Sequence, residues 1–568
     1  MDKRYIIAAV LTFLVLIAWQ YYFAPPPRPP ERAQPQESSP VEVVPREPVQ
    51  DEPTAAEPES TIEASPIEAA VQAQAEEEIT IETADHRVVL TNRGGRVVSW
   101  TLRSFTGRDG EPLQAVPAHL DNGDLLPLGV ELGDPSLSRA VNEALHKVER
   151  DRLPAGDGQG PGTRIRFRWA DGRGLESVKT LEFRDDDPLV GVNAEVTDRG
   201  RSLPVGITWG PGFETRQGAG GLGSYYYANQ ALWNMGGQVT RDRKLKEAIG
   251  GAGNLKWAGI EDQYFTALII PLDERAEFRV WTVDIVPGAS EEAEPEAEPR
   301  PMVAVSLTEQ GALLFIGAKQ YREMRLLGYD LQNAVWFSSV ALFAWMARIL
   351  YAALIWIYTN IISNYGVAII LTTMALRIVL FPLNQFSMVR IKKTQTEMQK
   401  VQPKINAIKN KYRKKKDAES RAQMNQEVMA LYKKEGINPM GGMTGCLPML
   451  AQFPILIGFY DMLLAAVELR GAPFFGWIQD LTLKDPYYVT PLLMGITMFL
   501  QQKMSMTKGG DPAQQRIMMM TPVIFTVMFL NLPSGLVLYW FVNNLLGIGQ
   551  QWLVKRHIGQ LAKAAKPV

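Results

Sequence analysis

The stretch IILTTMALRIVLFPL, residues 369–383, is apolar almost throughout, yet Arg377 stands in its middle. It lies within the apolar segment 364–386, whose length is typical of a helix that crosses the roughly 30 Å hydrocarbon core of a membrane. Arginine stays protonated in proteins, and a cation at mid-helix costs about 2.5–3.5 kcal/mol to insert. The stretch therefore predicts an environment that stabilises this charge.

Two kinds of environment could stabilise the Arg377 charge, and the sequence leaves both open. Asp461, in the apolar segment 446–469, is the one candidate for an acidic partner at the middle depth of the membrane, because Glu468 lies near the outer end of that segment. The alternative is a water-filled cavity lined by polar groups of several apolar segments: Thr373, Gln452, Tyr539, Asn543 and Asn544. Each of these is by itself typical of contacts between membrane helices. Together with a permanent cation they predict a hydrophilic groove within the bilayer.

A strongly basic loop follows this span and determines its orientation. Residues 387–436 contain many Lys and Arg but few Asp or Glu, so the loop belongs on the cytoplasmic side. Apolar residues recur there at helical steps, for example Val401 with Ile405 and Val428 with Leu431. The pattern predicts a hairpin of two helices. The hairpin is either a solvated face that enforces topology or a docking site for lipid headgroups or ribosomal RNA.

The N-terminal part predicts a membrane anchor followed by a linker. Residues 1–23 read MDKRYIIAAVLTFLVLIAWQYYF, an uncharged run behind Lys3 and Arg4 that is long enough to span a bilayer. A cleaved signal peptide, the alternative, has a shorter apolar core and a small-residue cleavage site. Residues 24–77 are rich in Pro, Glu and Ala and cannot bury enough apolar area to become ordered. We expect an uncleaved anchor with its N-terminus in the cytoplasm, then a disordered linker.

Residues 78–325 alternate between apolar and polar positions in short runs broken by Gly, Asp and Pro. Examples are HRVVLTNRGGRVVSWTL and KTLEFRDDDPLVGVNAEV. A period of two with turn signals predicts an antiparallel β-sandwich. Because this region follows the first anchor, we expect it outside the cytoplasm.

The remaining apolar segments complete a six-span topology with both termini in the cytoplasm. Residues 331–360 are placed flat at the outer interface, because only one span can return the chain to the basic loop. The expected parts are an interfacial amphipathic helix (326–363), spans at 364–386, 446–469, 487–504, 517–533 and 534–554, and a basic tail (555–568). The LPSG sequence between the last two spans predicts a tight outer turn.

Composition excludes several classes of function. The net charge is −2, and the single cysteine allows no intrachain disulfide. The sequence has no HExxH motif, no Walker A motif and no Cys/His cluster. We expect no enzyme, no catalytic residue, no metal and no cofactor.

The chain resembles the YidC/Oxa/Alb family of bacterial membrane protein insertases, in its Gram-negative form with a large periplasmic domain. The matching stretches include ALRIVLFPL, MALYKKEGINPMGG, CLPMLAQFPILIGFYDML and FLNLPSGLVLYWFVNNL. The resemblance covers the whole chain, and it implies a polytopic α-helical membrane protein with a five-helix insertase core. It also implies a groove open to the cytoplasm and to lipid but closed outward.

The resemblance assigns expected roles to individual residues. Groove residues would be Arg377, Thr373, Gln452, Tyr539, Trp540 and Asn544. Family members often have a tyrosine where Trp540 stands, so an aromatic contact but no phenol is expected there. Substrate helices would slide along Phe453, Met528 and Phe529. Ribosome or targeting contacts would be made by Lys411, Arg413, Lys414, Lys415 and Lys416.

The implied function is insertion and folding of nascent inner-membrane proteins, alone or with the Sec translocon. Expected partners are nascent membrane proteins, the Sec translocon, the ribosome with the signal-recognition targeting machinery, and membrane lipids. The alternatives are a secondary transporter, which usually shows internal repeats that we do not find, or a Sec-dependent accessory factor. The sequence leaves open the client set, the ligand of the periplasmic domain, the oligomeric state and the exact placement of residues 331–360.

Overall fold

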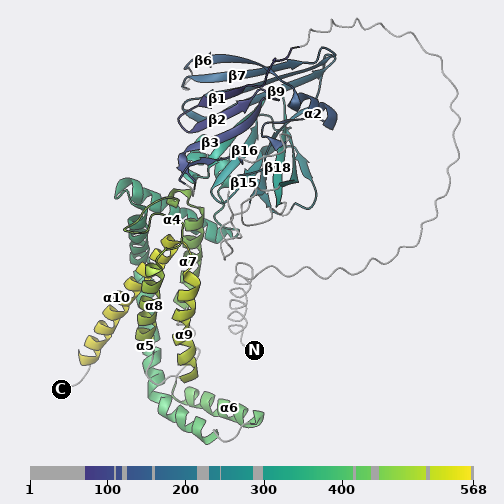
Figure 1. The fold of residues 1–568 in the computed structure, drawn as a ribbon. Helices are drawn as coiled ribbons and strands as arrows, with labels where there is room; N and C mark the ends of the chain where they lie inside the picture. Colours follow the sequence, from purple (N-terminus) through teal and green to yellow (C-terminus); the bar gives the residue numbers. More distant parts are fainter. Residues whose placement is uncertain are drawn as a thin grey trace, which may run out of the picture. The chain divides into compact units, whose positions relative to one another are not determined.

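The computed structural model describes ten ranges of the chain, all within one compact unit, Glu68–Val568. These ranges are 71–107, 110–117, 125–156, 160–213, 229–243, 245–285, 298–412, 417–436, 447–506 and 512–564. The expected anchor (1–23) and most of the linker (24–77) lie outside them. The described part begins with strands and ends with helices (Figure 1), so the predicted division into a sheet-rich and a helical region is confirmed.

Every strand pairing in the sheet-rich region is antiparallel among the described residues. A four-stranded sheet runs in the order β1 (Glu78–Glu82), β2 (His86–Thr91), β3 (Arg96–Thr106), β4 (Pro112–Gln114). A five-stranded sheet has the order β14 (Ile249–Ala252), β17 (Glu277–Ile285), β18 (Glu298–Leu307), β11 (Val205–Trp209), β5 (Val130–Glu131).

The largest sheet has ten strands. Its order is β13 (Gln238–Asp242), β12 (Gln230–Met235), β15 (Leu255–Glu261), β16 (Phe265–Pro271), β19 (Ala312–Ala318), β9 (Asp187–Asp198), β8 (Leu175–Arg184), β7 (Gly162–Ala170), β6 (Lys147–Leu153). The short β10 (Arg201–Ser202) pairs with β9 beside this path.

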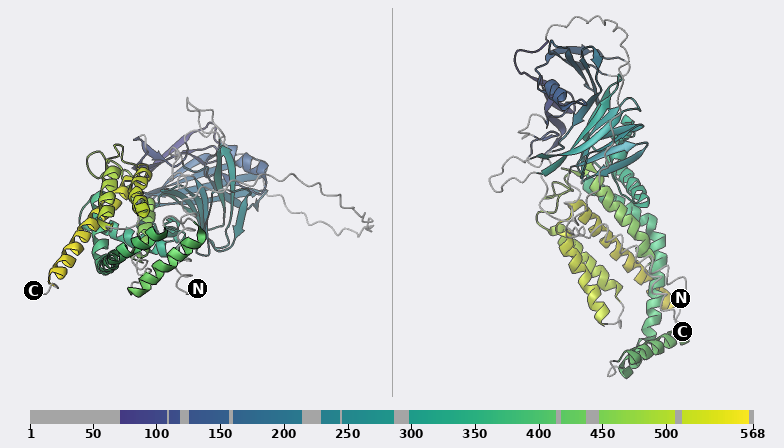
Figure 2. Two further views of the ribbon diagram at one scale, coloured as in Figure 1. Left: turned by 90° about the horizontal axis from the view of Figure 1, so that it is seen from below. Right: turned by 90° about the vertical axis from the view of Figure 1, so that its right-hand side faces the viewer.

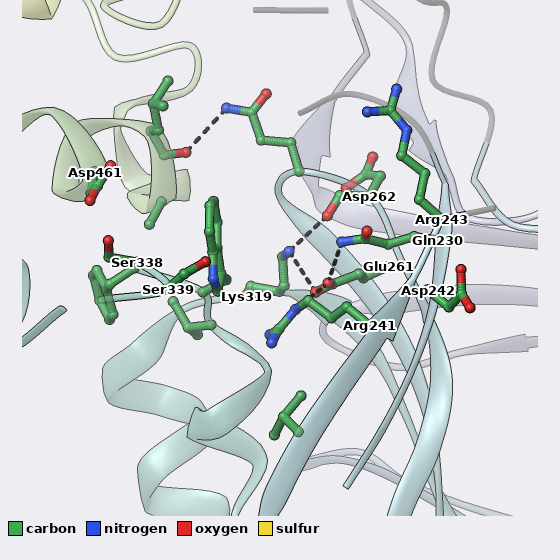
Figure 3. A pocket seen from close by; sticks show the side chains of 17 residues that line it. Gln230, Arg241, Asp242, Arg243, Glu261, Asp262, Lys319, Ser338, Ser339 and Asp461 are labelled. Carbon is green, nitrogen blue, oxygen red and sulfur yellow. Dashed lines mark hydrogen bonds and ion pairs between the residues drawn. The ribbon is translucent and has the colours of Figure 1, made fainter. Parts of the chain in front are cut away.

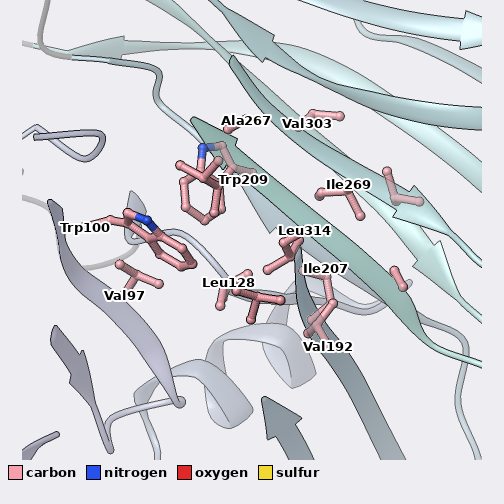
Figure 4. Packing of buried hydrophobic residues seen from close by; sticks show 14 of the residues in the cluster. Val97, Trp100, Leu128, Val192, Ile207, Trp209, Ala267, Ile269, Val303 and Leu314 are labelled. Atoms are coloured by element: carbon pink, nitrogen blue, oxygen red, sulfur yellow. The ribbon is translucent and has the colours of Figure 1, made fainter. Parts of the chain in front are cut away.

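One hydrophobic core joins the three sheets. Trp100 of β3 and Trp209 of β11 meet edge to face with ring centroids 5.8 Å apart (Figure 4). Both indoles are buried, and Leu314 of β19 belongs to the same cluster. Aromatic pairs of this geometry contribute beyond their buried area. Alternating strand residues therefore point inward, as a period of two requires.

Strand β16 is buried on both faces, which explains its continuous apolar sequence FTALIIP. Ala267 and Ile269 belong to the core of the sheets. Leu268 and Ile270 belong to a second core that extends into the helical region. The outer side of this strand is thus covered by helices and their connections rather than by water.

The helical region contains short and long helices. The short helices are α3 (Tyr321–Leu327), η3 (Leu331–Ala334) and η5 (Val467–Leu469), whereas α2 (Pro135–Glu143) lies in the sheet-rich region between β5 and β6. The long ones are α4 (Ala341–Asn360), α5 (Tyr365–Tyr412), α6 (Ala418–Lys434), α7 (Leu447–Ala465), α8 (Val489–Ser505), α9 (Pro512–Phe529) and α10 (Ser534–Ala564). Figures 1 and 2 show α5, α8 and α10 running together, with α10 in contact with both neighbours.

Two of the described helices are long and apolar enough to cross a membrane, Ala341–Asn360 and Tyr365–Pro382. Shorter apolar helices cover Pro454–Ala465 and Met519–Phe529. Helix α4, the first of the two, packs against α7 at Gly458, where an added Cβ would lie 2.9 Å from Cβ of Met346.

The turn between α9 and α10 is held by a different loop. Ser534 is buried, and its amide donates to the carbonyl of Leu483 at 2.7 Å. Gly535 donates likewise to Leu481 at 2.9 Å. The loop between α7 and α8 thus satisfies amides at the start of α10 that have no partner inside the helix. The LPSG sequence separates two helices here.

Candidate functional site

Arg377 on α5 is partly buried and bound to α10. Its Nε donates to Oδ1 of Asn543 at 2.7 Å, and its Nη2 donates to the backbone carbonyl of the same residue at 2.9 Å. Both acceptors are uncharged. The guanidinium is therefore oriented by hydrogen bonds while its positive charge is not neutralised by Asn543.

Asp461, the acidic candidate for Arg377, lies elsewhere. Its side chain is 4% exposed and lines a cavity beside Ser338 and Ala465. One carboxylate oxygen, Oδ2, has no hydrogen-bond partner among the described residues. Of the two environments that the sequence left open, the structure favours a polar surrounding for Arg377 over a pair with Asp461.

Gly547 and Gln501 belong to the surroundings of Arg377, and sequence reasoning missed both. A Cβ added at Gly547 on α10 would clash with Nε2 of Gln501 on α8 and lie 3.5 Å from Nη2 of Arg377. The missing side chain leaves room for an amide of one helix and a guanidinium of another. The two polar residues Gln501 and Gln502 in an apolar segment were a signal of a polar contact. The sequence does not show how α8 is rotated, and this rotation decides that Gln501 is the one that faces Gly547.

Further amide side chains occur toward the C-terminal ends of α8 and α10 and on α5. Gln551 donates to Oγ of Ser505 at 2.9 Å. Buried Asn384 and Gln550 each have a side-chain nitrogen without a partner among the described residues. Buried polar atoms that the protein does not satisfy are usually satisfied by water. Helices α5, α8 and α10 therefore carry polar groups suited to a hydrated space near Arg377.

The other predicted groove residues contribute differently. Thr373 is fully buried, and its hydroxyl donates to the carbonyl of Ile369 in its own helix at 2.7 Å. Tyr539 is also buried and stacks on Phe459, with ring centroids 4.0 Å apart. Asn544 donates to the carbonyl of Met494 at 3.4 Å. The side chain of Gln452 lies outside the described part of the structure.

Helix α9 presents an apolar face, though with a different phase from that predicted. Phe529 is buried and meets Trp540 edge to face at 5.0 Å, and Met528 is partly buried. The side chain of Phe453 is not described. Among the described side chains of this helix, residues 519–529, the exposed face includes four residues that are each exposed by 60–62%: Met520, Val523, Ile524 and Val527.

The basic residues are described in part. Lys411 at the end of α5 is exposed and pairs with Glu427 of α6 at 2.7 Å. Helix α6 packs on α5 through Val401 and Ile405. Arg413, Lys414, Lys415 and Lys416 lie outside the described residues. Among those described, no group of three His, Cys, Asp or Glu side chains could hold a metal ion.

Two family models match consecutive parts of the chain. The model described as YidC periplasmic domain matches residues 78–353, and the model described as 60Kd inner membrane protein matches residues 356–561. The chain is thus an inner-membrane protein with a periplasmic domain, which contains the sheets described above.

Proteins named membrane protein insertase YidC are similar to the chain over nearly its whole length. The relative from Syntrophus aciditrophicus is 34% identical over 98% of this chain and 100% of its own length. The relative from Oleidesulfovibrio alaskensis is 34% identical over 98% of this chain and 99% of its own length. A crystal structure of an active YidC insertase is 16% identical with a TM-score of 0.35, over 85% of this chain and 95% of that chain. The chain belongs to the YidC family.

Proposed function

We propose that the chain is a membrane protein insertase that inserts nascent inner-membrane proteins and helps them fold. The observation that carries the mechanism is Arg377, a cation inside an apolar helix that is held by the neutral Asn543. Its charge remains available to a substrate. No nucleotide or metal is needed, because hydrophobic partition and the membrane potential supply the driving force.

The surroundings of Arg377 fit a groove that lowers the cost of moving a short polar segment into the bilayer. Removing a peptide group from water without replacing its hydrogen bonds costs roughly 2–7 kcal/mol. The amides of Gln501, Asn543 and Gln550 offer donors and acceptors at the helices that flank the guanidinium. Acidic residues of a translocating segment would also be attracted to Arg377.

The exposed face of α9 fits the path by which an apolar substrate helix leaves into lipid. Met520, Val523, Ile524 and Val527 expose apolar side chains along one side of the helix. Methionine is flexible and polarizable, so it can accommodate helices of varied sequence. Buried Phe529 and partly buried Trp540 would shape the groove from behind this face.

The proposed topology has six spans with both termini in the cytoplasm. Helix α4 lies flat at the outer interface, and the first part of α5 with α7, α8, α9 and α10 forms the five-helix core. The end of α5 and α6 form a cytoplasmic hairpin, where Lys411 and residues 413–416 would contact the ribosome or the targeting machinery. Work beside the Sec translocon is part of this proposal.

The first test is insertion into liposomes that contain only the purified protein. The client is a small protein with one or two apolar spans and a short acidic segment that must be translocated. Protection of that segment from protease reports insertion, and empty liposomes give the baseline. Protection well above this baseline would support an autonomous insertase. Protection at the baseline would favour a Sec-dependent accessory factor or a secondary transporter.

Two variants separate the charge of Arg377 from the polarity around it. Arg377→Ala removes the cation, whereas Asn543→Asp keeps it and places a carboxylate at the atom that already accepts from Nε. We expect both variants to insert clients with acidic segments less well and clients with neutral segments normally. Normal insertion of acidic segments by Asn543→Asp would contradict the charge role and leave the polar groove as the important feature.

A further inference from the structure

A cavity of about 700 Å³ lies where the sheets meet the helices (Figure 3). One wall comes from the ends of β13 and β15, and it includes Arg241 and Glu261. The opposite wall comes from residues 335–339, which precede α4, and from the last turn of α7 with Asp461. The cavity is separate from the groove residues around Arg377, because none of those residues lines it.

The wall on the sheet side is a satisfied network of charges. Glu261 accepts from Nε of Arg241 at 2.7 Å and from Nζ of Lys319 at 2.9 Å. Gln230 donates to the same carboxylate at 2.8 Å, and Lys319 also donates to the carbonyl of Asp262 at 2.7 Å. Burial raises the pKa of Glu261, but Arg241 and Lys319 outweigh burial and keep this pKa low. This wall is therefore preformed.

Where the two walls meet, Asp461 of α7 and Gln263 of the turn between β15 and β16 carry acceptors that have no partner among the described residues. The side chain of Asp461 is only 4% exposed, and its Oδ2 has no hydrogen-bond partner among the described residues. Gln263 donates from Nε2 to the carbonyl of Leu464 at 3.1 Å, while its Oε1 has no such partner. Buried acceptors without donors are costly, so the arrangement requires a group that donates hydrogen bonds.

Other features of the wall on the helix side favour a cationic donor. Leu464 and Ala465 belong to the last turn of α7, where the helix dipole is negative. Trp336 and Phe337 line the cavity and can offer ring faces to a cation. Arg243, the third cation of the lining, lies on the opposite side and suits a phosphate.

We propose that this cavity binds the head group of an aminophospholipid of the outer leaflet. The primary ammonium donates to Asp461 and Gln263, and the phosphate faces Arg243. The depth fits because α7 ends here at the outer interface, a placement that rests on the topology proposed above. Such a lipid would supply donors to the unsatisfied acceptors of Asp461 and Gln263 and would bridge α7 and the sheets.

The test is lipid titration of the full-length protein in detergent, followed by native mass spectrometry. The probes are phosphatidylethanolamine, phosphatidylcholine, which lacks N–H donors, and phosphatidylglycerol, which lacks the ammonium. We expect one phosphatidylethanolamine bound about tenfold more tightly than either other lipid, the size of one charge-assisted hydrogen bond. Equal binding of the three lipids would overturn the assignment. Free phosphoethanolamine that competes as well as the lipid would overturn a lipid as the occupant.

Three variants complete the experiment. Asp461→Asn removes the negative charge and one of the two acceptor oxygens, and we expect about tenfold weaker binding of the ammonium. Ser339→Trp fills the cavity from an exposed position without changing a charge, and we expect binding to be lost. Asp330→Asn is the matched control. It is exposed outside the cavity, and its φ of 57° is one that asparagine tolerates. Wild-type affinity in both cavity variants would overturn the proposal.

Discussion

At the scale of single residues, Arg377 shows how a partly buried cation can be oriented without being neutralised. A carboxylate partner would have neutralised the positive charge, whereas the two hydrogen bonds to the uncharged Asn543 leave it in place. Among the described residues, the cost of placing arginine in an apolar helix is reduced by a polar neighbour rather than by an ion pair. The proposed attraction of an acidic substrate depends on this unneutralised charge.

The absence of a side chain at Gly547 lets the polar groups of Gln501 and Arg377 lie close together, and a substitution tests whether this closeness matters. Gly547→Leu would displace the Gln501 amide and crowd the guanidinium, so we expect insertion of acidic segments to fall about tenfold, which corresponds to roughly 1.4 kcal/mol. Gly549→Leu on the same helix is the matched control, because a Cβ added at Gly549 would have no atom within 4 Å. The liposome assay compares them, and equal insertion by both variants would argue against a role for this gap.

At the scale of elements, α5 joins two tasks in one continuous helix of 48 residues. Its first part carries Arg377 and its last part packs against α6. The contact with α6 is small: buried Val401 and Ile405, with partly buried residues of α6 around them. Asp417 is the N-cap of α6, and its side chain accepts from the amide of Ser420 at 2.9 Å.

We predict that the apolar contact, and not the ion pairs, holds α6 on α5. Ile405→Ala removes a buried side chain and should cost about 2–5 kcal/mol, enough to release α6. Glu427→Gln breaks the exposed pair with Lys411 and should have little effect, since water and salt screen such pairs. Hydrogen exchange of residues 418–434 measures the release. Faster exchange in Glu427→Gln than in Ile405→Ala would contradict the prediction.

At the scale of the whole molecule, the sheets contain a buried cationic cluster that should respond to pH. Lys179 donates to the carbonyls of Gly94 and Gly95, and burial together with the charge of Arg96 lowers its pKa to about 7. Burial and the charge of Lys179 lower the pKa of His146 to about 4. In the folded state His146 therefore binds fewer protons than in the unfolded state between about pH 6.5 and pH 4, and Lys179 does so at higher pH, between about 10.5 and 7.

The sheets should lose stability as the pH falls from about 6.5 toward 4. For His146 alone the loss reaches about 3 kcal/mol, because unfolding lets the imidazole take up a proton. His146→Asn should lack this component, since the amide can still donate to the carbonyl of Ala144 and does not titrate. Hydrogen exchange of β6 and β8 at pH 7 and pH 4.5 compares the two proteins. An equal loss in both would show that His146 is not the titrating group.

Several features of this molecule could be predicted from local sequence. The division into sheets and helices was visible because alternation and long apolar runs have different periods. Val401 and Ile405 stood out at helical steps and do pack against α6. The side of α9 that is exposed was harder to predict from the sequence. Val523 and Val527 lie on its exposed face, whereas Phe529 is buried.

The sequence by itself determined that a cation lies within an apolar helix, and that polar groups occur in neighbouring apolar segments. Only the tertiary structure decided that Arg377 binds Asn543 and that Asp461 lines a different cavity. It also brought Gln501 and Gly547 together from two helices. The physical reason is that helix periodicity is local, whereas the partner of a side chain depends on how each helix is rotated and shifted against its neighbours.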